Sequence, residues 1–403
     1  MREAKKSICI ISFSRIDADA RVLRQIRFLS RDYEIAVIGY GDAPPAGHDG
    51  SPVRWLPTTY APAGAGGVAA KLRRRALLLG GRLRPANYDD WYWGQPQYRD
   101  ALEKALASGC DAFHANDWNT LPVAAEAARR LNARLVFDAH EYAPLEFENR
   151  WAWRLAYSAM ITHMLRRYAP QADATITVAP AIAERYRREF QLAPMVVLNA
   201  PDSVQLPETK TAGVDFNNIR LIHHGAAIPD RRLEVMIRAL ALCDQRYTLH
   251  FMLTRNNAAY VRHLERLAEE LAPGRVSFNP PVEPEEIVQR VSAYDMGFCF
   301  IAPTNYNYLV CLPNKFFEYI AAALPVCIGP SPSMSEIVRS YKLGCVAPSF
   351  EPGDLAAVLN GLSGEQMLSM REAARAAAKR INAACEMGKV VELYKRLLPG
   401  GAS

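Results

Sequence analysis

Two clusters of basic side chains, each beside a predicted helix start, carry the most informative chemistry of the sequence. In "LPNKFFEYIAAA", Pro313 suits a first helical turn because proline has no amide hydrogen to leave unsatisfied there. Lys315 falls in that turn, where a cation opposes the helix dipole unless an anion lies nearby. Glu318 shares a helix face with Lys315 and Asn314. The pattern fits a phosphate beside a ribose-binding carboxylate, or a plain Lys–Glu pair on a surface helix.

The same conflict recurs upstream, in "HHGAAIPDRRLE". A strand is predicted to end at His224, and the small residues 225–227 allow a ligand to approach the backbone closely. We expect Asp230 to cap a helix that begins with Arg231 and Arg232. Two cationic helix starts in one half of the chain favour a diphosphate between them.

Alternating strands and helices must position these side chains. Apolar strand-like runs alternate with amphipathic stretches throughout, which predicts two doubly wound α/β domains of Rossmann-like type. The domains expected are 1–200 and 219–382, joined by a polar linker at 201–218. One helix is expected over 370–398, with its part from about 383–400 packing back on the first domain. Ligands bind at the carboxyl ends of strands in such sheets.

Composition excludes several other classes of protein. Half of the 403 residues are hydrophobic and 22% are charged, as in globular proteins rather than disordered or fibrous ones. The eight cysteines are scattered without a CxxC pair, which is typical of a reducing compartment. The sequence shows neither a secretory signal nor an apolar run of about 18 residues, so a cytoplasmic location is expected.

The net charge of +6 comes entirely from residues 1–200, which hold 27 Lys and Arg against 21 Asp and Glu. The densest basic patch is Lys71–Arg84, and the stretch Asn149–Ala169 mixes tryptophans with arginines. Either segment fits a peripheral contact with the inner face of an anionic membrane. Ordinary helices with one face in the core explain both patterns as well.

Several segments together identify a family resemblance. "NYNYLVCLPNKFFEYIAAALPVCIG" resembles the donor site of retaining glycosyltransferases of the GT-B fold in family 4, also described as group 1. "GAAIPDRRLEVMIRAL" is similar to that family's phosphate-contacting turn and helix. "DADARVLRQIRFL", "FHANDWNTLPVAAEAARRLNARLVFDAHEY" and "ITVAPAIAERYRREF" resemble family segments in the same order. The likeness implies two Rossmann-like domains facing a central cleft.

The resemblance implies roles for the second half of the chain. Arg231 and Lys315 would neutralise the donor diphosphate and stabilise charge on the leaving nucleotide. Glu318 would hold the ribose, and the backbone at 278–282 would contact the base. The donor-binding positions implied in this way are Gly225, Ala226, Arg231, Pro281, Val282, Asn305, Tyr306, Asn307, Tyr308, Asn314, Lys315 and Glu318.

In the first half, "FHAND" and "FDAHE" both end predicted strands. His140 matches a sugar-contacting histidine of the family, and Asp117 either orients an acceptor hydroxyl or caps the helix near Thr120. With Arg231 and Lys315, these two are the predicted catalytic residues. The acceptor-side candidates are Arg15, Asp19, His114 and Glu141. For Asp19 a helix cap, and for His114 a contact within the fold, is the favoured alternative.

The resemblance implies a retaining glycosyltransferase that moves a hexose-type unit from a nucleotide sugar, with UDP the expected nucleotide, to a glycan or lipid-linked glycan. No cofactor, metal or nucleic acid is expected. The literal DxD at 17–19 suggests a metal, but it lies in the first loop and cations already supply countercharge.

Three positions depart from the family pattern. Val310 stands where the family has the first acid of a glutamate pair, and Ala323 and Arg232 stand where glycine is frequent. Two alternatives therefore stay open: a sugar-nucleotide epimerase of the same fold, and a non-catalytic nucleotide-sugar-binding or scaffold protein.

Overall fold

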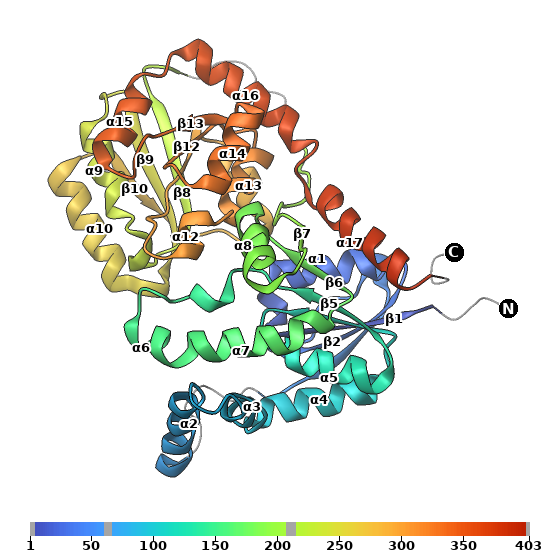
Figure 1. Cartoon of the computed structure of the whole chain (residues 1–403). Helices are drawn as coiled ribbons and strands as arrows, with labels where there is room; N and C mark the ends of the chain where they lie inside the picture. The colour runs from blue at the N-terminus through green and yellow to red at the C-terminus, as the bar shows by residue number, and fades with distance from the viewer. Residues whose placement is uncertain (1–4, 60–66, 207–214, 400–403) are drawn as a thin grey trace. The chain divides into compact units, whose positions relative to one another are not determined.

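The computed structural model describes residues 5–59, 67–206 and 215–399, and it divides into two compact units (Figure 1). Unit 1 comprises Met1–Val197 with Met387–Ser403, and unit 2 comprises Leu198–Glu386. Residues 207–214 of the predicted linker, and 60–66 of the Pro/Gly-rich stretch before the basic patch, lie outside the described residues. Each unit is a parallel sheet with helices on both faces, so the predicted α/β class is confirmed.

Unit 1 contains seven parallel strands in the order β3-β2-β1-β4-β5-β6-β7. The strands are β1 Ser7–Arg15, β2 Glu34–Tyr40, β3 Val53–Pro57, β4 Ala112–Asn116, β5 Arg134–Asp138, β6 Ala174–Thr177 and β7 Met195–Val196. The helices are α1 Ala20–Leu29, α2 Val68–Gly80, α3 Ala86–Trp93, α4 Pro96–Ser108, α5 Leu121–Leu131, α6 Trp151–Trp153, α7 Ala159–Tyr168 and α8 Pro180–Phe190. A π-helical turn, Arg154–Ser158, joins α6 to α7.

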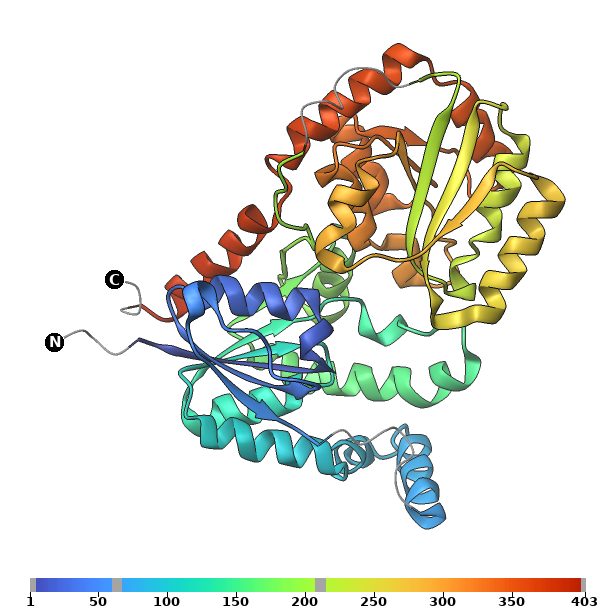
Figure 2. The same ribbon diagram turned by 180° about the vertical axis from the view of Figure 1, so that it is seen from behind.

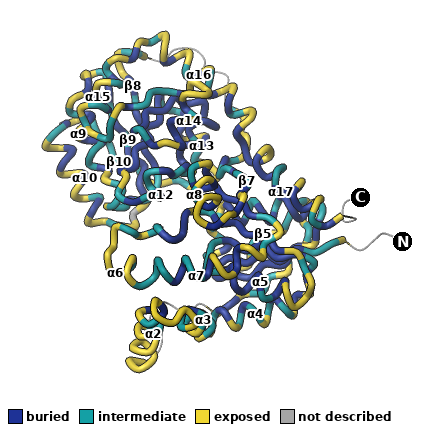
Figure 3. Tube along the Cα trace, in the orientation of Figure 1, coloured by how far each residue is buried: buried dark blue, intermediate teal, exposed yellow. Residues whose placement is uncertain are grey.

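Apolar runs form the central strands because both faces of the sheet are covered. Residues 8–11 of β1 have no exposed surface, and the middle of β2 is equally buried (Figure 3). Helices α4 and α5 lie on one face of the sheet and α1 on the other (Figures 1 and 2). The strand order reverses direction between β1 and β4, so the carboxyl ends of these two strands flank the crevice where such folds bind ligands.

Unit 2 repeats the arrangement with six parallel strands in the order β10-β9-β8-β11-β12-β13. The strands are β8 Ile219–Ala226, β9 Tyr247–Thr254, β10 Val276–Asn279, β11 Met296–Cys299, β12 Val326–Ile328 and β13 Gly344–Val346. The helices are α9 Glu234–Leu242, α10 Ala258–Leu271, α11 Ile287–Val291, α12 Tyr306–Val310, α13 Asn314–Ala321, α14 Pro332–Tyr341, α15 Pro352–Asn360 and α16 Gly364–Ala378. Here the order reverses between β8 and β11.

A close approach of backbone to ring sets the position of α13. A Cβ atom added to Gly297, on β11, would lie 2.4 Å from Cδ2 of Tyr319. Glycine at this strand position lets the helix that carries Lys315 lie directly against the sheet. The Tyr319 hydroxyl in turn accepts a hydrogen bond of 3.3 Å from the backbone N–H of His224 on β8.

The single helix predicted over 370–398 is wrong, because the chain forms two helices there. Helix α16 ends at Ala378, and α17 Ala383–Leu397 begins after a break. Asn382 explains the break, since its side-chain oxygen accepts a hydrogen bond of 3.0 Å from the backbone N–H of Cys385 and so caps α17. From Met387 onward the chain belongs to unit 1, where the Tyr394 hydroxyl lies 2.9 Å from Nδ1 of His114.

Among the described residues, no helix is long and apolar enough to cross a bilayer.

Two of the family departures share one backbone feature. Arg232 and Ala323 both have left-handed backbone, with φ of 51° and 53°. Glycine is frequent in such positions because an added Cβ disfavours this conformation. Arg232 and Ala323 therefore have a backbone conformation in which glycine is favoured.

Replacing Arg232 by glycine should stabilise the protein. Arg232 is exposed, so Arg232→Gly relieves left-handed strain without losing buried surface, and we expect the free energy of unfolding to rise by about 0.5 kcal/mol. Arg238→Gly, at an exposed position inside α9, should lower it by about 1 kcal/mol. Urea denaturation measures both variants, and equal destabilisation would show that residue 232 carries no backbone strain.

Candidate functional site

The predicted donor-binding residues of unit 2 all follow the carboxyl ends of strands. Gly225 and Ala226 end β8, and Pro281 and Val282 follow β10. Residues 305–308, which begin α12, come after β11, as do Asn314, Lys315 and Glu318 of α13. Since β8 and β11 flank the reversal of strand order, the unit brings α13 and the end of β8 to the crevice where open α/β sheets bind ligands.

Lys315 is almost fully buried, with 5% of its surface exposed, and its Nζ lies 2.9 Å from Nε2 of His223. The other ring nitrogen of His223, Nδ1, lies 2.9 Å from the carbonyl oxygen of Phe298. A carbonyl only accepts, so Nδ1 carries the proton and Nε2 accepts a hydrogen bond from the lysine. Burial and the charge of Lys315 lower the pKa of His223, in keeping with this neutral tautomer. The sequence analysis missed His223, although it is a histidine on a strand otherwise rich in buried apolar residues.

Burial and the neighbouring Arg231 guanidinium lower the pKa of Lys315 to about 7. Nε of Arg231 is buried and finds no hydrogen-bond partner among the residues that the structure describes, and Cζ lies 5.9 Å from the centroid of the Tyr308 ring. Gly225, with φ of 115°, leaves room for the lysine, because a Cβ there would lie 3.4 Å from Nζ. Two cations thus share a poorly solvated space in which a bound anion would stabilise both.

The prediction that Asp230 caps a helix beginning at Arg231 is wrong. Residues 229–231 form a single 3-10 turn, Arg232 takes the left-handed conformation, and α9 begins only at Glu234. Hydrogen bonds to the segment after β11 hold this turn instead. The Thr304 hydroxyl donates to the Asp230 carbonyl at 3.0 Å, and the Ala302 N–H donates to the Arg231 carbonyl at 3.2 Å.

Lys315, by contrast, is the second residue of α13, in the first turn as predicted.

Glu318 lies one turn further along α13, and its Oε2 is 3.2 Å from Nε2 of His224. Burial and Lys315 lower the pKa of His224 to about 3, so this imidazole is neutral near pH 7. Asn305 is used differently, since its side-chain oxygen accepts a hydrogen bond of 2.8 Å from the backbone N–H of Tyr308 and caps α12.

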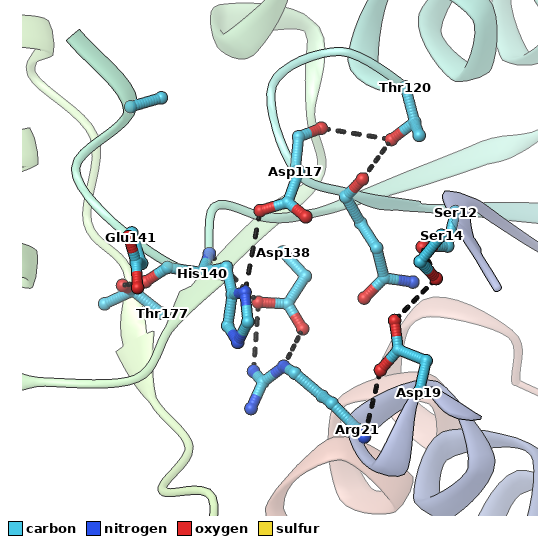
Figure 4. Close-up of polar contacts among 12 residues, drawn as sticks. Ser12, Ser14, Asp19, Arg21, Asp117, Thr120, Asp138, His140, Glu141 and Thr177 are labelled. Carbon is cyan, nitrogen blue, oxygen red and sulfur yellow. Dashed lines mark hydrogen bonds and ion pairs between the residues drawn. The ribbon is translucent and has the colours of Figure 1, made fainter. Parts of the chain in front are cut away.

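Unit 1 brings Asp117 and His140 together at the carboxyl ends of β4 and β5 (Figure 4). Nδ1 of His140 lies 3.6 Å from Oδ1 of Asp117. Burial alone would lower the pKa of His140, but the Asp117 carboxylate outweighs it and raises that pKa to about 9. Both residues have left-handed backbone, with φ of 67° and 52°. Strain of this kind, at about 1–2 kcal/mol for each residue, clusters at functional sites.

Asp117 does not cap α5, so that alternative is wrong. The cap position belongs to Thr120, whose hydroxyl donates to the Asp117 carbonyl oxygen at 3.0 Å. The Asp117 carboxylate is thus left facing His140 (Figure 4).

A buried ion pair beneath His140 escaped the sequence analysis. Arg21 of α1 binds the fully buried Asp138 with two hydrogen bonds, of 2.6 and 2.9 Å (Figure 4). Gln25 donates a third hydrogen bond of 3.0 Å to the same carboxylate. Burial alone would raise the pKa of Asp138, but the Arg21 guanidinium holds it well below its usual range. The backbone N–H of His140 donates to the same carboxylate at 3.3 Å. The pair therefore fixes the backbone that carries the histidine.

The acceptor-side candidates divide into structural and exposed residues. Asp19 caps α1 by accepting from the N–H groups of residues 21 and 22, at 3.1 and 3.2 Å, so the cap alternative is confirmed. His114 is fully buried and lies against the Tyr394 hydroxyl, so the alternative that it makes a contact within the fold is confirmed. Arg15 is exposed and pairs with Asp17, and Glu141 is exposed.

Glu146 is a further candidate that the sequence analysis missed. Burial, Glu141 and Asp117 together raise its pKa to about 7, so this carboxyl lies in the same acidic environment as His140. Its signal in the sequence is only a glutamate five residues after another glutamate.

The two acids of the DxD pattern are already engaged, Asp17 with Arg15 and Asp19 with α1. Within the part of the chain that the structure describes, no group of three His, Cys, Asp or Glu residues is arranged to hold a metal ion.

Comparisons with known proteins agree with this geometry. Residues 21–202 match the model of Glycosyltransferase Family 4, and residues 218–364 match that of Glycosyl transferases group 1. Among curated protein sequences, none matches the chain.

Solved structures resemble the chain along its whole length. The Anabaena protein HepE in complex with UDP is 17% identical, with a TM-score of 0.69 over 97% of this chain and 100% of that one. Sucrose-phosphate synthase from Thermosynechococcus elongatus is 15% identical, with a TM-score of 0.71 over 98% and 99%. WaaG, a glycosyltransferase involved in lipopolysaccharide biosynthesis, is 15% identical, with a TM-score of 0.59 over 98% and 100%. At these identities the likeness shows the fold, which is GT-B-like.

The His140–Asp117 pair predicts an unusual titration. The imidazole should titrate near pH 9, and in Asp117→Asn its pKa should fall, because the carboxylate that raises it most is removed while burial and Arg21 still lower it. Asparagine tolerates the left-handed backbone, so the fold should persist. Since the folded pKa is raised, the pair stabilises the protein below pH 6.5 and this contribution disappears above pH 9. Histidine NMR measures the pKa, with the exposed Asp90→Asn as control; equal midpoints in all three proteins would contradict the pairing.

Proposed function

This chain belongs to the family 4 glycosyltransferases, and from that premise we propose that it is a retaining hexosyltransferase that uses a UDP-sugar. The observation that carries the proposal is the pair of poorly compensated cations, Lys315 and Arg231, at the strand-order reversal of unit 2. A nucleoside diphosphate supplies the anion that both side chains require.

In this proposal, different residues of unit 2 bind the diphosphate, the ribose and the base of the donor. Arg231 and Lys315 bind the diphosphate, whose charge raises the pKa of Lys315 and keeps the lysine protonated. When the bond from sugar to phosphate breaks, negative charge grows on the leaving nucleotide, and these two cations stabilise it. Glu318 accepts hydrogen bonds from the ribose hydroxyls, and the backbone near Pro281 and Val282 contacts the base. The countercharge comes from side chains, so no divalent ion is required.

UDP is the preferred nucleotide in this proposal because the similar Anabaena protein is described in complex with UDP and with UDP-glucose.

Val310, which replaces an acid of the family pattern, is buried in α12. Recognition of the sugar therefore falls to its neighbours Tyr306, Asn307 and Tyr308, assisted by His140. Asp117 holds that imidazole protonated and oriented, and the leaving phosphate takes the proton of the acceptor hydroxyl as the new bond forms on the same face of the sugar.

The acceptor in this proposal is a glycan on a lipid, met at an anionic membrane surface by α2 and α6. Of α2 only Leu78 is buried, and Figure 3 shows the rest of the helix largely exposed. Leu83 is 94% exposed and Trp151 74%, and both segments contribute to one surface, because Nη2 of Arg82 donates to the carbonyl of Leu155 at 3.2 Å.

Charge argues for lipid rather than protein as the partner of this surface. Its exposed basic residues are Lys71, Arg73, Arg75, Arg82, Arg84, Arg150 and Arg154. From 67 to 88 the sequence contains no acidic residue. Exposed apolar side chains among these cations match the apolar interior and anionic head groups of a membrane surface.

Calorimetry with UDP, GDP and ADP tests the donor site. We expect UDP to bind, with or without EDTA, and Lys315→Ala to weaken binding by about 10- to 100-fold because charge-assisted hydrogen bonds to phosphate are lost. Glu318→Ala should weaken binding less. The exposed Arg266→Ala and Glu270→Ala on α10 are matched controls. Binding that none of these changes affects would overturn the assignment.

The reaction products separate the alternatives. A UDP-sugar incubated without acceptor yields an epimer if the protein is an epimerase, and stays intact if it only binds nucleotide sugars. Sugar transferred to a lipid-linked glycan with its anomeric configuration unchanged identifies the proposed enzyme.

Vesicle sedimentation tests the membrane surface. The protein should sediment with phosphatidylglycerol vesicles, should not sediment with phosphatidylcholine vesicles, and should be released by salt. Leu79→Gln with Leu83→Gln should reduce binding about tenfold or more, because about 50 Å² or more of apolar contact is lost at each leucine. Leu242→Gln, at an exposed leucine of unit 2, is the control. If the double variant binds as the wild type does, α2 is not the contact.

A further inference from the structure

A cavity lies at the opposite end of the unit 1 sheet from His140. It has a volume of about 450 Å³, and it lies where β1, β2 and β3 begin, with Ser7, Glu34 and Val53 in its wall. Cys110, just before β4, also lines it. The donor and sugar residues all follow carboxyl ends of strands, so this amino-end cavity is separate from the proposed catalytic chemistry.

A guanidinium lies beside the Cys110 sulfur. Nη2 of Arg54, on β3, is 3.3 Å from Sγ of Cys110 and donates a hydrogen bond of 2.7 Å to the Ser108 carbonyl oxygen. Arg54 is exposed and also lines the cavity, whereas Cys110 is 2% exposed. The sulfur thus meets a cation at the wall of a space that small molecules can enter.

A second thiol completes the environment of Cys110. The strand register aligns Arg54 with Ala36 and Ala36 with Cys9, so Arg54 and Cys9 lie in one row across three strands and point to the same face. The thiol of Cys9, which is fully buried, is hydrogen-bonded to the Cys110 sulfur. This bond, followed by Ser108 and Arg54, lowers the pKa of Cys110 to about 6, while it raises the pKa of Cys9 well above its usual range. The Arg54 guanidinium, 3.3 Å from the sulfur, favours the thiolate form of Cys110.

We propose that Cys110 is a modification site, where the thiolate held by Arg54 and Cys9 is oxidised by a small peroxide that enters this cavity. The sulfur attacks one peroxide oxygen, an S–O bond forms as the O–O bond breaks, and hydroxide leaves and takes up a proton to become water. Cysteine is oxidised to a sulfenic acid and the peroxide is reduced. Arg54 and the Cys9 thiol, which favour the thiolate, act as positioning residues for this step.

The test is hydrogen peroxide treatment of the full-length protein at pH 6.5, with trapping of sulfenic acid by a cyclic diketone and peptide mass spectrometry. Cys110 should be trapped before Cys385, an exposed cysteine of α17 that serves as the internal reference. Arg54→Gln should slow the reaction of Cys110 about tenfold, corresponding to a rise of about one pKa unit. Arg54→Lys should restore much of the rate, and Arg129→Gln, at an exposed arginine of α5, should leave it unchanged.

The pH dependence of Cys110 alkylation in the wild type needs no variant. A midpoint near pH 6 supports the proposal. A midpoint above about 8.5, the value of an ordinary thiol, or reaction of Cys385 before Cys110, would overturn it.

Discussion

Burial of the Lys315 charge is the constraint on which the donor site depends. A lysine removed from water loses hydration, and its amine here contacts a neutral imidazole, while Arg231 nearby adds repulsion. The surrounding structure fits an anion-binding site. Gly225 leaves space beside Nζ, and the Phe298 carbonyl fixes the tautomer of His223 so that its free nitrogen can accept from the amine.

Unit 1 offers the contrasting case, because its buried charges satisfy each other. Arg21 and Asp138 are joined by two hydrogen bonds and supported by Gln25, so this pair requires no ligand and acts as a scaffold for His140. The strained pair above it, His140 and Asp117, is partly open to solvent. The balance of charge therefore separates structural from ligand-binding ionic groups in this protein. The same criterion singles out the thiolate of Cys110, whose cation lies at the wall of a cavity.

The sequence predicted the features that depend on local pattern. Strand–helix alternation gave both parallel sheets, and proline at 313 placed Lys315 in the first turn of α13. The sequence did not predict the features that depend on contacts between residues far apart in the chain. Arg21 and Asp138 are 117 positions apart, and no periodicity couples them. The Arg231 turn is held by residues after β11 rather than by its own cap, and a single asparagine, Asn382, divides the last predicted helix.

Proton uptake on UDP binding tests the central claim most directly. Near pH 8 a free Lys315 with a pKa of about 7 is mostly neutral, and a bound diphosphate restores its proton. Calorimetry at pH 8 in buffers of different ionisation enthalpy should therefore show uptake of close to one proton per UDP, and Lys315→Met should abolish it. Binding without proton uptake, or uptake that persists in Lys315→Met, would contradict the view that this buried lysine is the diphosphate's partner.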